Sequence, residues 1–159
     1  MLFMLRATQK ITLSPGSTWE FFSNPNNLSE LVPSSLHFEV LHNPPSKIHS
    51  GMILTYTVAP VLRIPWTWVT EISHVVERQY FVDDQRAGPY RMWHHQHLFH
   101  ADGSGTVVED VVHYSLFAPG VESLVNRLVV RPRVTEIFRY RGQRMSELFG
   151  GSEQRLTVS

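Results

Sequence analysis

The feature that most constrains the fold is a succession of short strand patterns between His37 and Leu116. Apolar and polar residues alternate through this stretch, as they do along strands that bury one face of a sheet. Proline, glycine, asparagine, aspartate or a polar stretch separates each pattern from the next. Such short spacers leave no room for the helical crossovers that parallel strands need. The sequence therefore predicts six consecutive antiparallel strands, at His37–Leu41, Met52–Val58, Ile64–Ile72, Gln79–Gln85, Met92–Ala101 and Thr106–Leu116.

Elements of other kinds precede this stretch. One more strand is predicted over Phe3–Leu13, where a Ser-Pro-Gly sequence stops it. Two short helices follow. Ser17 and Glu20 have the spacing of a capping box and predict the start of the first, while Asn24 and Pro25 predict a capped start for the second.

A helical pattern closes the chain. From Leu124 to Leu148 apolar residues recur at spacings of mostly three and four, which predicts one long amphipathic helix, bent at Pro132. The predicted fold class is α+β: a curved seven-stranded antiparallel sheet wrapped around this helix, with the two short helices between strands 1 and 2. Residues 1–149 form one domain, and the polar tail 150–159 is expected to fray.

Composition excludes several functions. The chain has 14 basic and 14 acidic side chains, so its net charge of zero does not suit a nucleic-acid binder. It has no cysteine, which excludes disulfides and thiolate metal sites. Met1–Lys10 is too short and too polar for a signal peptide, and no apolar run could span a membrane. We expect a cytoplasmic protein without a cofactor; the oligomeric state is left open.

The last predicted hairpin can be aligned residue by residue. If the turn at Asp102–Gly105 places Ala101 opposite Thr106, then His97 pairs with Asp110, and one face of the hairpin becomes clearly more apolar than the other. That inner face carries Trp93, His95, His97, Phe99, Val108, Asp110, Val112 and Tyr114. The outer face carries His94 and His113, which we expect to be solvated.

The alignment extends to the preceding strands. A loop over Arg86–Tyr90 would place Asp83 beside Trp93 and Phe81 beside His95. The next hairpin would bring Trp66 and Trp68 near Asp83 and Gln85. A solid core would not hold so many polar groups, because each unpaired one costs about 1–3 kcal/mol. The sequence therefore predicts an aromatic ligand cavity lined by Trp66, Trp68, Phe81, Asp83, Gln85, Trp93, His95, His97, Phe99, Asp110 and Tyr114, with Phe138 and Arg141 from the helix.

The two inward histidines admit several interpretations. His95 and His97 leave the same face of one strand, so they could bind a metal if Asp110 supplied a third ligand. We favour instead a hydrogen-bonded structural pair in which Asp110 orients His97, and expect no metal. A polar ligand anchor or a general base is the next alternative. Arg141 could pair with Asp110 or Asp83, grip a ligand carboxylate, or extend to the rim of the cavity.

The order of elements and two motifs resemble the START-like superfamily. The motifs are Phe81–Tyr90 running into Trp93-His94-His95-Gln96-His97-x-Phe99, and Asp110-x-Val112-x-Tyr114. This helix-grip group (SRPBCC, Bet v 1-like) includes polyketide cyclases, plant pathogenesis-related proteins and lipid-transfer domains. The chain is most similar, over about residues 3–149, to a bacterial subfamily sometimes labelled cell-division-inhibitor-like. The resemblance implies a cavity between sheet and helix for apolar or aromatic ligands, but it transfers no catalytic residue.

Three functions remain open from the sequence. The first is a binding protein for a small hydrophobic, aromatic or lipid-like molecule. The second is an enzyme of the cyclase, aromatase or dehydratase type, with His95, His97 and Asp110 as acid–base groups; an enzyme is the less favoured interpretation. The third is a regulatory interaction domain whose cavity has collapsed.

Overall fold

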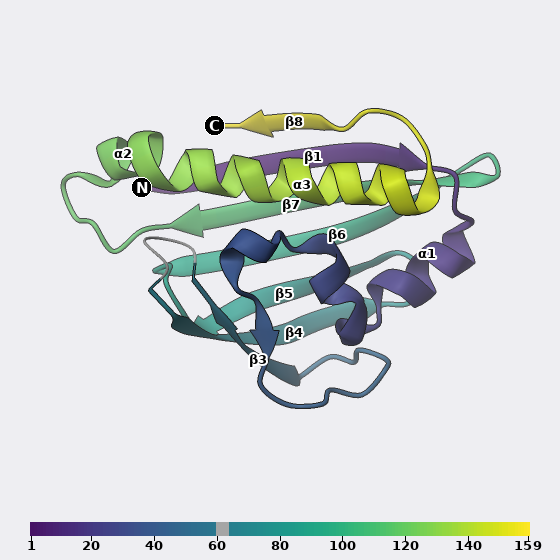
Figure 1. Ribbon diagram of the computed structural model, residues 1–159, viewed down its shortest axis with the longest axis horizontal. Helices are drawn as coiled ribbons and strands as arrows, with labels where there is room; N and C mark the ends of the chain where they lie inside the picture. The colour runs from purple at the N-terminus through teal and green to yellow at the C-terminus, as the bar shows by residue number, and fades with distance from the viewer. Residues whose placement is uncertain (60–63) are drawn as a thin grey trace.

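The computed structural model describes residues 1–59 and 64–159, and its main element is one antiparallel sheet (Figure 1). The strands follow the order β2-β3-β4-β5-β6-β7-β1-β8. Every strand predicted from the alternating pattern is present, and Met52–Val58 has the predicted bounds. The strands are β1 (Phe3–Ile11), β2 (Glu39–Val40), β3 (Met52–Val58), β4 (Trp66–Val76), β5 (Tyr80–Ala87), β6 (Met92–Asp102), β7 (Gly105–Ser115) and β8 (Arg155–Val158).

The eighth strand corrects the prediction for the chain's end. The sequence predicts that residues 150–159 fray, but β8 pairs with β1 and places Leu156 opposite Ala7. The free edge of β1 offers backbone partners, and the Gln9 side chain reinforces the contact by donating to the Ser152 carbonyl at 3.1 Å. At Gly142, a Cβ atom would lie 2.7 Å from the Gln154 side chain, so glycine lets the tail cross close to the helix. The sheet therefore has eight strands rather than seven.

Both predicted short helices lie between β1 and β2, with one correction. Helix α1 (Pro15–Phe22) begins three residues earlier than predicted, because Ser14 and not Ser17 is its cap: the Ser14 hydroxyl accepts from the Ser17 amide at 3.3 Å. Asn24 caps the 3₁₀ helix η1 (Pro25–Leu31) as predicted. A single 3₁₀ turn, η2 (Ser34–Leu36), follows it and was not predicted.

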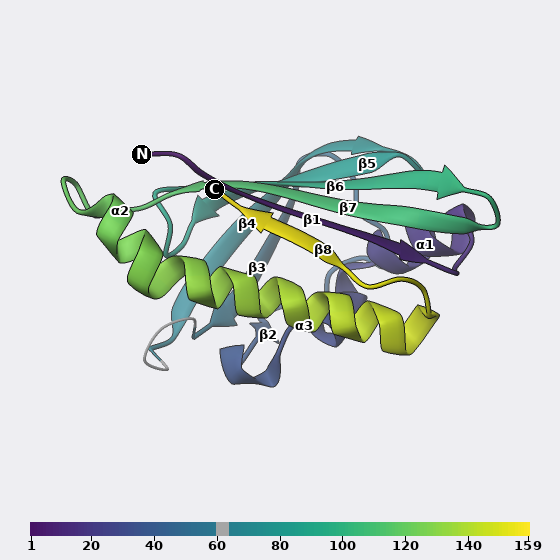
Figure 2. The ribbon, with the colours of Figure 1, turned by 90° about the horizontal axis from the view of Figure 1, so that it is seen from above.

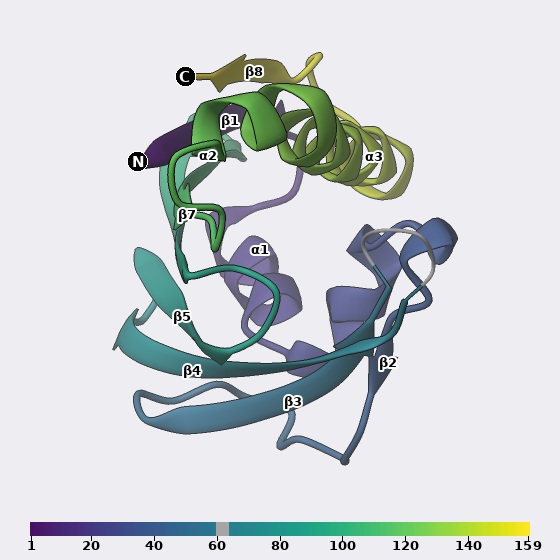
Figure 3. The same cartoon turned by 90° about the vertical axis from the view of Figure 1, so that its left-hand side faces the viewer.

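The C-terminal helix runs through three joined segments: α2 (Glu122–Val125), the π-helical η3 (Asn126–Val130) and α3 (Arg131–Phe149). The predicted irregularity at Pro132 takes the form of this π segment. Proline has no amide hydrogen to donate to the preceding turn, so the hydrogen-bond ladder widens just before it. Figures 2 and 3 show the helix lying across the concave side of the curved sheet. Among the described residues, no helix has both the length and the apolar character of a membrane span.

Two hydrophobic clusters join the helices to the sheet. At one end, α1 places Trp19 and Phe22 against Phe99 of β6, with Met145 of α3 in the same cluster. Toward the other end, Val134 and Phe138 of α3 belong to a cluster with Leu5, Val112 and Tyr114 of β1 and β7. The site described next lies between the sheet and α3, alongside both clusters.

Candidate functional site

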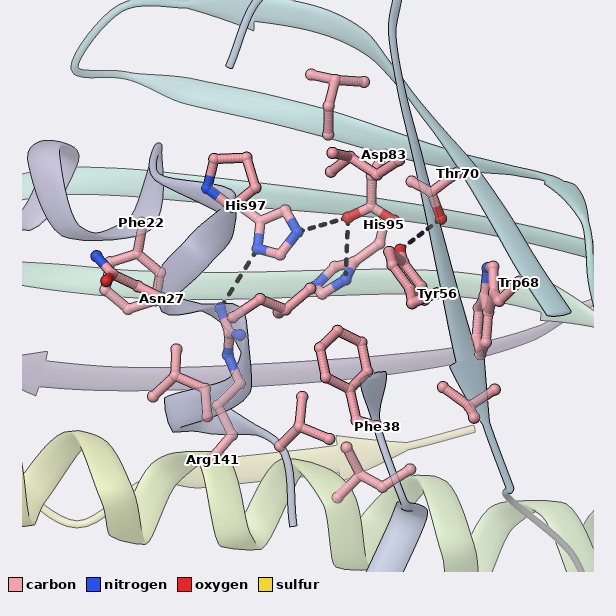
Figure 4. A pocket seen from close by; sticks show the side chains of 18 of the residues that line it. Phe22, Asn27, Phe38, Tyr56, Trp68, Thr70, Asp83, His95, His97 and Arg141 are labelled. Carbon is pink, nitrogen blue, oxygen red and sulfur yellow. Dashed lines mark hydrogen bonds and ion pairs between the residues drawn. The ribbon is translucent and has the colours of Figure 1, made fainter. Parts of the chain in front are cut away.

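A cavity of about 180 Å³ lies between the inner face of the sheet and helix α3. Most of its wall is apolar, and the 3₁₀ helix η1 contributes Leu28 and Leu31 to it. Eight of the predicted site residues line the cavity: Trp68, Phe81, Asp83, Trp93, His95, His97, Phe138 and Arg141. Figure 4 shows several of these side chains from close by.

One part of the wall is a group of aromatic rings. Trp68 and Trp93 meet edge to face with their ring centroids 5.4 Å apart, and Tyr90 lies 4.7 Å from Trp93. Such offset and edge contacts are the favourable geometries for aromatic pairs. Phe38 and Tyr56 extend the group across β3. These rings are inclined to one another and form an aromatic part of the cavity wall.

Beside these rings lies a buried cluster of charged and polar side chains, called the His–Asp cluster: Asp83, His95, His97, Asp110 and Arg141. Trp93 and His95 leave the same face of β6, with their ring centroids 6.3 Å apart. Asp83 comes from β5, the histidines from β6, Asp110 from β7 and Arg141 from α3. Alternation along β6 directs His95 and His97 to the same face, and the predicted pairing of His97 with Asp110 is observed. The β6–β7 register is the predicted one throughout, with Trp93 opposite Tyr114.

Each histidine in the cluster bridges the two aspartates. His97 Nε2 lies 2.7 Å from Asp83 Oδ2, and His97 Nδ1 lies 3.0 Å from Asp110 Oδ1. His95 Nε2 lies 3.0 Å from Asp110 Oδ1, and His95 Nδ1 lies 3.5 Å from Asp83 Oδ2. Figure 4 shows both imidazoles beside Asp83. One ring nitrogen of each histidine thus faces Asp83, and the other faces Asp110.

Arg141 neutralises Asp110 from the helix side. Its Nε atom donates to Asp110 Oδ2 at 3.0 Å, and a terminal nitrogen donates to Oδ1 at 3.1 Å. The guanidinium also lies 5.2 Å from the centre of the Phe22 ring. Arg141 is buried, so of the predicted alternatives the pairing with Asp110 is observed and extension to the rim is not. A two-point arginine–carboxylate contact fixes geometry as well as charge.

Burial opposes charge on both aspartates and both histidines of the cluster, and the neighbouring charges oppose or add to its effect on each pKa. At Asp110, Arg141 and the two imidazoles outweigh burial and hold the pKa well below its usual range. At Asp83, the facing histidines likewise outweigh burial and lower the pKa. The pKa values of the two histidines shift in opposite directions. Burial and the adjacent His97 lower the pKa of His95, whereas Asp110 and Asp83 outweigh burial and raise the pKa of His97.

Five predicted site residues do not line the cavity. Trp66 lies at the start of β4, before the part of that strand that pairs with β5, and is 46% exposed. Gln85 binds the backbone of Tyr90 and closes the β5–β6 loop. Phe99 is packed against α1, and Tyr114 donates to Asn126 of the π segment at 2.8 Å. Asp110 lies behind the two imidazoles rather than in the wall.

The register between β5 and β6 also differs from the prediction. Asp83 lies opposite His95 and Phe81 opposite His97, each two residues further along β6 than predicted. The reason is that pairing between β5 and β6 stops at Asp84 and His94, further from the turn than predicted. A shift of two keeps every side chain on its predicted face. It exchanges Trp93 for His95 as the neighbour of Asp83, and so creates the His–Asp cluster.

The sequence interpretation missed a second polar pair in the wall. Tyr56 of β3 donates to the Thr70 hydroxyl of β4 at 2.6 Å, as Figure 4 shows. Burial, with Asp83 nearby, raises the pKa of the Tyr56 hydroxyl, so it stays protonated. Period-two alternation from the inward Leu54 would have placed Tyr56 on the inner face.

No protein-family model and no curated protein matches the chain. Solved structures do share its fold. Protein TTHA0849 from Thermus thermophilus superposes with a TM-score of 0.69 at 17% identity, over 91% of this chain and 94% of the other. Major latex-like protein 151 from Panax ginseng gives 0.65 at 11% identity, over 93% and 97%. A norcoclaurine synthase from Thalictrum, solved with a transition-state analogue, gives 0.63 at 15% identity, over 93% and 96%.

Identities this low establish the fold alone. The chain therefore has the Bet v 1-like, START-like helix-grip fold that the sequence resemblance implied.

Proposed function

We propose that the protein binds a small, mostly apolar molecule that has an aromatic portion and one polar group. The observation that carries this proposal is the cavity of about 180 Å³, whose wall holds a group of aromatic rings and, beside them, the polar side chains of Asp83, His95, His97 and Arg141. Pockets with an apolar lining and a few convergent polar groups are typical of small-molecule sites. An open cavity also supports binding over the alternative of a collapsed regulatory domain.

The size of the cavity limits the ligand. Drug-sized ligands occupy pockets of roughly 300–1,000 Å³, whereas an apolar cavity of about 150 Å³ holds benzene. A cavity of about 180 Å³ therefore suits one or two fused rings. The aromatic wall favours a flat ligand, and the buried polar side chains favour one hydrogen-bonding substituent at one end. A long acyl chain does not fit this volume unless η1 moves.

The test is titration of the protein with 2-naphthol and with naphthalene, followed by tryptophan fluorescence. We expect 2-naphthol to quench Trp68 and Trp93 and to bind at least tenfold more tightly than naphthalene, because its hydroxyl reaches the polar wall. Leu54→Trp would fill the cavity and weaken binding of 2-naphthol at least tenfold. Ile53→Trp is the matched control, because Ile53 precedes Leu54 on β3 but is 47% exposed.

Two results would contradict the proposal. One is the absence of saturable quenching by either compound; the other is equal weakening by Leu54→Trp and Ile53→Trp. Native mass spectrometry of protein purified from its own host would then show whether a different molecule occupies the cavity.

A second candidate is proton transfer, and the observation that favours it is the divergence of the two histidines. The lowered pKa of His95 favours the neutral imidazole that a base requires, and the raised pKa of His97 favours the protonated imidazole that an acid requires. We test it with 2-tetralone in D₂O, following exchange of the protons beside its carbonyl by NMR. Faster exchange that His95→Gln abolishes and His94→Gln preserves supports catalysis; exchange at the uncatalysed rate contradicts it.

A further inference from the structure

Three side chains of the His–Asp cluster present their polar atoms to one common point. Asp83 Oδ2 lies 2.7 Å from His97 Nε2 and 3.5 Å from His95 Nδ1. One ligand atom from each of the three residues lies within 4.8 Å of the other two. Ligand atoms at about 2.0–2.2 Å from a tetrahedral metal are roughly 3.3 Å apart, so small side-chain rotations suffice to surround an ion.

The other ring nitrogen of each histidine faces Asp110, on the side away from Asp83. Asp110 Oδ1 lies 3.0 Å from His95 Nε2 and 3.0 Å from His97 Nδ1, and Arg141 fixes the Asp110 carboxylate at two points. Histidines that bind metals usually donate their other N–H to a carboxylate, which fixes the tautomer and turns the free lone pair toward the metal. Asp110, the third ligand considered from the sequence, thus has the orienting position, and Asp83 has the ligand position.

The charges of the cluster leave room for a cation. Arg141 pairs with Asp110 and also donates to His97 Nδ1 at 3.4 Å, and among the ion pairs of the described residues those of Asp83 are with His95 and His97 alone. With both imidazoles neutral, the buried Asp83 carboxylate has no ion-paired cation, and Arg141 acts on it only from a distance. Such a charge is costly unless a proton or a metal ion accompanies it. A proton on His97 is one solution, and a divalent ion between the three side chains is the other.

The cavity provides space for further ligands of the ion, in addition to the three side chains. Asp83, His95 and His97 all line it, so an ion held by them has open positions toward its interior. Three protein ligands with an open side describe catalytic zinc sites, and two histidines with one carboxylate also describe mononuclear iron(II) sites. The imidazole ligands select against Mg²⁺ and Ca²⁺, which prefer oxygen.

We propose that Asp83, His95 and His97 bind one divalent transition-metal ion, Zn²⁺ or Fe²⁺, in the polar wall of the cavity. The site goes beyond the binding of an apolar ligand and does not depend on it. Asp110 and Arg141 act as positioning residues, because they hold the imidazoles and do not touch the ion.

The test uses the full chain, freed of metal with a chelator and titrated with Co²⁺ as a spectroscopic probe. We expect one equivalent to bind, with a visible absorption band of a low-symmetry Co²⁺ site, and one equivalent of Zn²⁺ to remove that band. Asp83→Asn and His97→Gln should each weaken Co²⁺ binding at least tenfold. Asp84→Asn and His94→Gln, one residue away on the outer face of the same strands, should leave it unchanged.

A measurement on the unaltered protein guards against variants that fail to fold. Zn²⁺, which is diamagnetic, should shift the NMR signals of the His95 and His97 rings more than those of the outer His94 and His113. Stoichiometric binding that is lost in the outer variants, or shifts confined to His94 and His113, would overturn the proposal, as would the absence of Co²⁺ binding at millimolar concentration. Binding of Co²⁺ without binding of 2-naphthol would refute the proposed ligand and retain the metal site.

Discussion

Two aspartate–histidine pairs join β5 to β6, one on each face of the sheet. On the outer face His94 Nδ1 lies 2.7 Å from Asp84, and on the inner face His97 Nε2 lies 2.7 Å from Asp83. The side chains of the outer pair are 34% and 25% exposed, and those of the inner pair 7% and 15%. The two pairs have the same nitrogen–oxygen distance but differ in their exposure to solvent. Water screens the outer pair, whereas the inner pair interacts in a medium of low dielectric constant.

The second difference is the number of partners. The inner pair continues through His95 and Asp110 to Arg141, so each of its charges has a compensating neighbour. Buried charged networks are stable when every member is satisfied and unstable when one is removed. The comparison indicates that equal contacts on two faces of one sheet have unequal energies.

The largest effect is expected from replacing Arg141, the residue of helix α3 that pairs with Asp110. Arg141→Leu leaves the Asp110 carboxylate buried without its strongest compensation and should lower the free energy of unfolding by about 3–5 kcal/mol. Urea denaturation measures it. Arg144→Leu, at a partly exposed arginine on the same helix, is the control and should leave the midpoint nearly unchanged. The double variant Arg141→Leu/Asp110→Asn should recover much of the loss; no recovery would mean that Arg141 stabilises through packing.

A smaller effect is expected from the direct comparison of the two aspartates. Asp83→Asn keeps the shape of the side chain but removes the inner charge, and it should cost about 1.5–3 kcal/mol, the range for hydrogen bonds to charged groups. Asp84→Asn removes the outer charge and should cost about 0–1 kcal/mol. Equal losses in the two variants would mean that burial does not distinguish the two faces.

The smallest effect is the pH dependence of the inner histidine. The folded pKa of His97 is raised, so its stabilising contribution is complete below the unfolded value, about 6.5, and disappears as pH rises through the folded pKa. The difference in unfolding free energy between the wild type and His97→Gln should therefore fall between mildly acidic and alkaline pH. His95 has the opposite sign: its lowered pKa makes stability decrease as pH falls below about 6.5. A His97→Gln difference that grows with pH would contradict the assignment.

Much of the fold could be predicted because its signals are local. Alternation located the strands of the sheet, and the short β6–β7 hairpin fixed the register that pairs His97 with Asp110. Features that depend on distant segments were missed. The tail pairs with β1 because that edge is free, and Trp66 is exposed because β5 pairs with β4 only from Val69 onward. Neither an open edge nor the end of a neighbouring strand leaves a distinct pattern in the residues that it affects.

By itself, the sequence determined which side chains share a face, since alternation along a strand is a property of the backbone and survives a shift of two residues. It thus separated His95 and His97 from His94. Only the tertiary structure decided which neighbours they meet. The β5–β6 pairing, which stops at Asp84 and His94, sets Asp83 opposite His95, and helix α3 brings Arg141 onto Asp110 across 31 residues of chain. Where strand pairing stops and how a helix packs depend on contacts throughout the molecule, so the face was predictable and the partners were not.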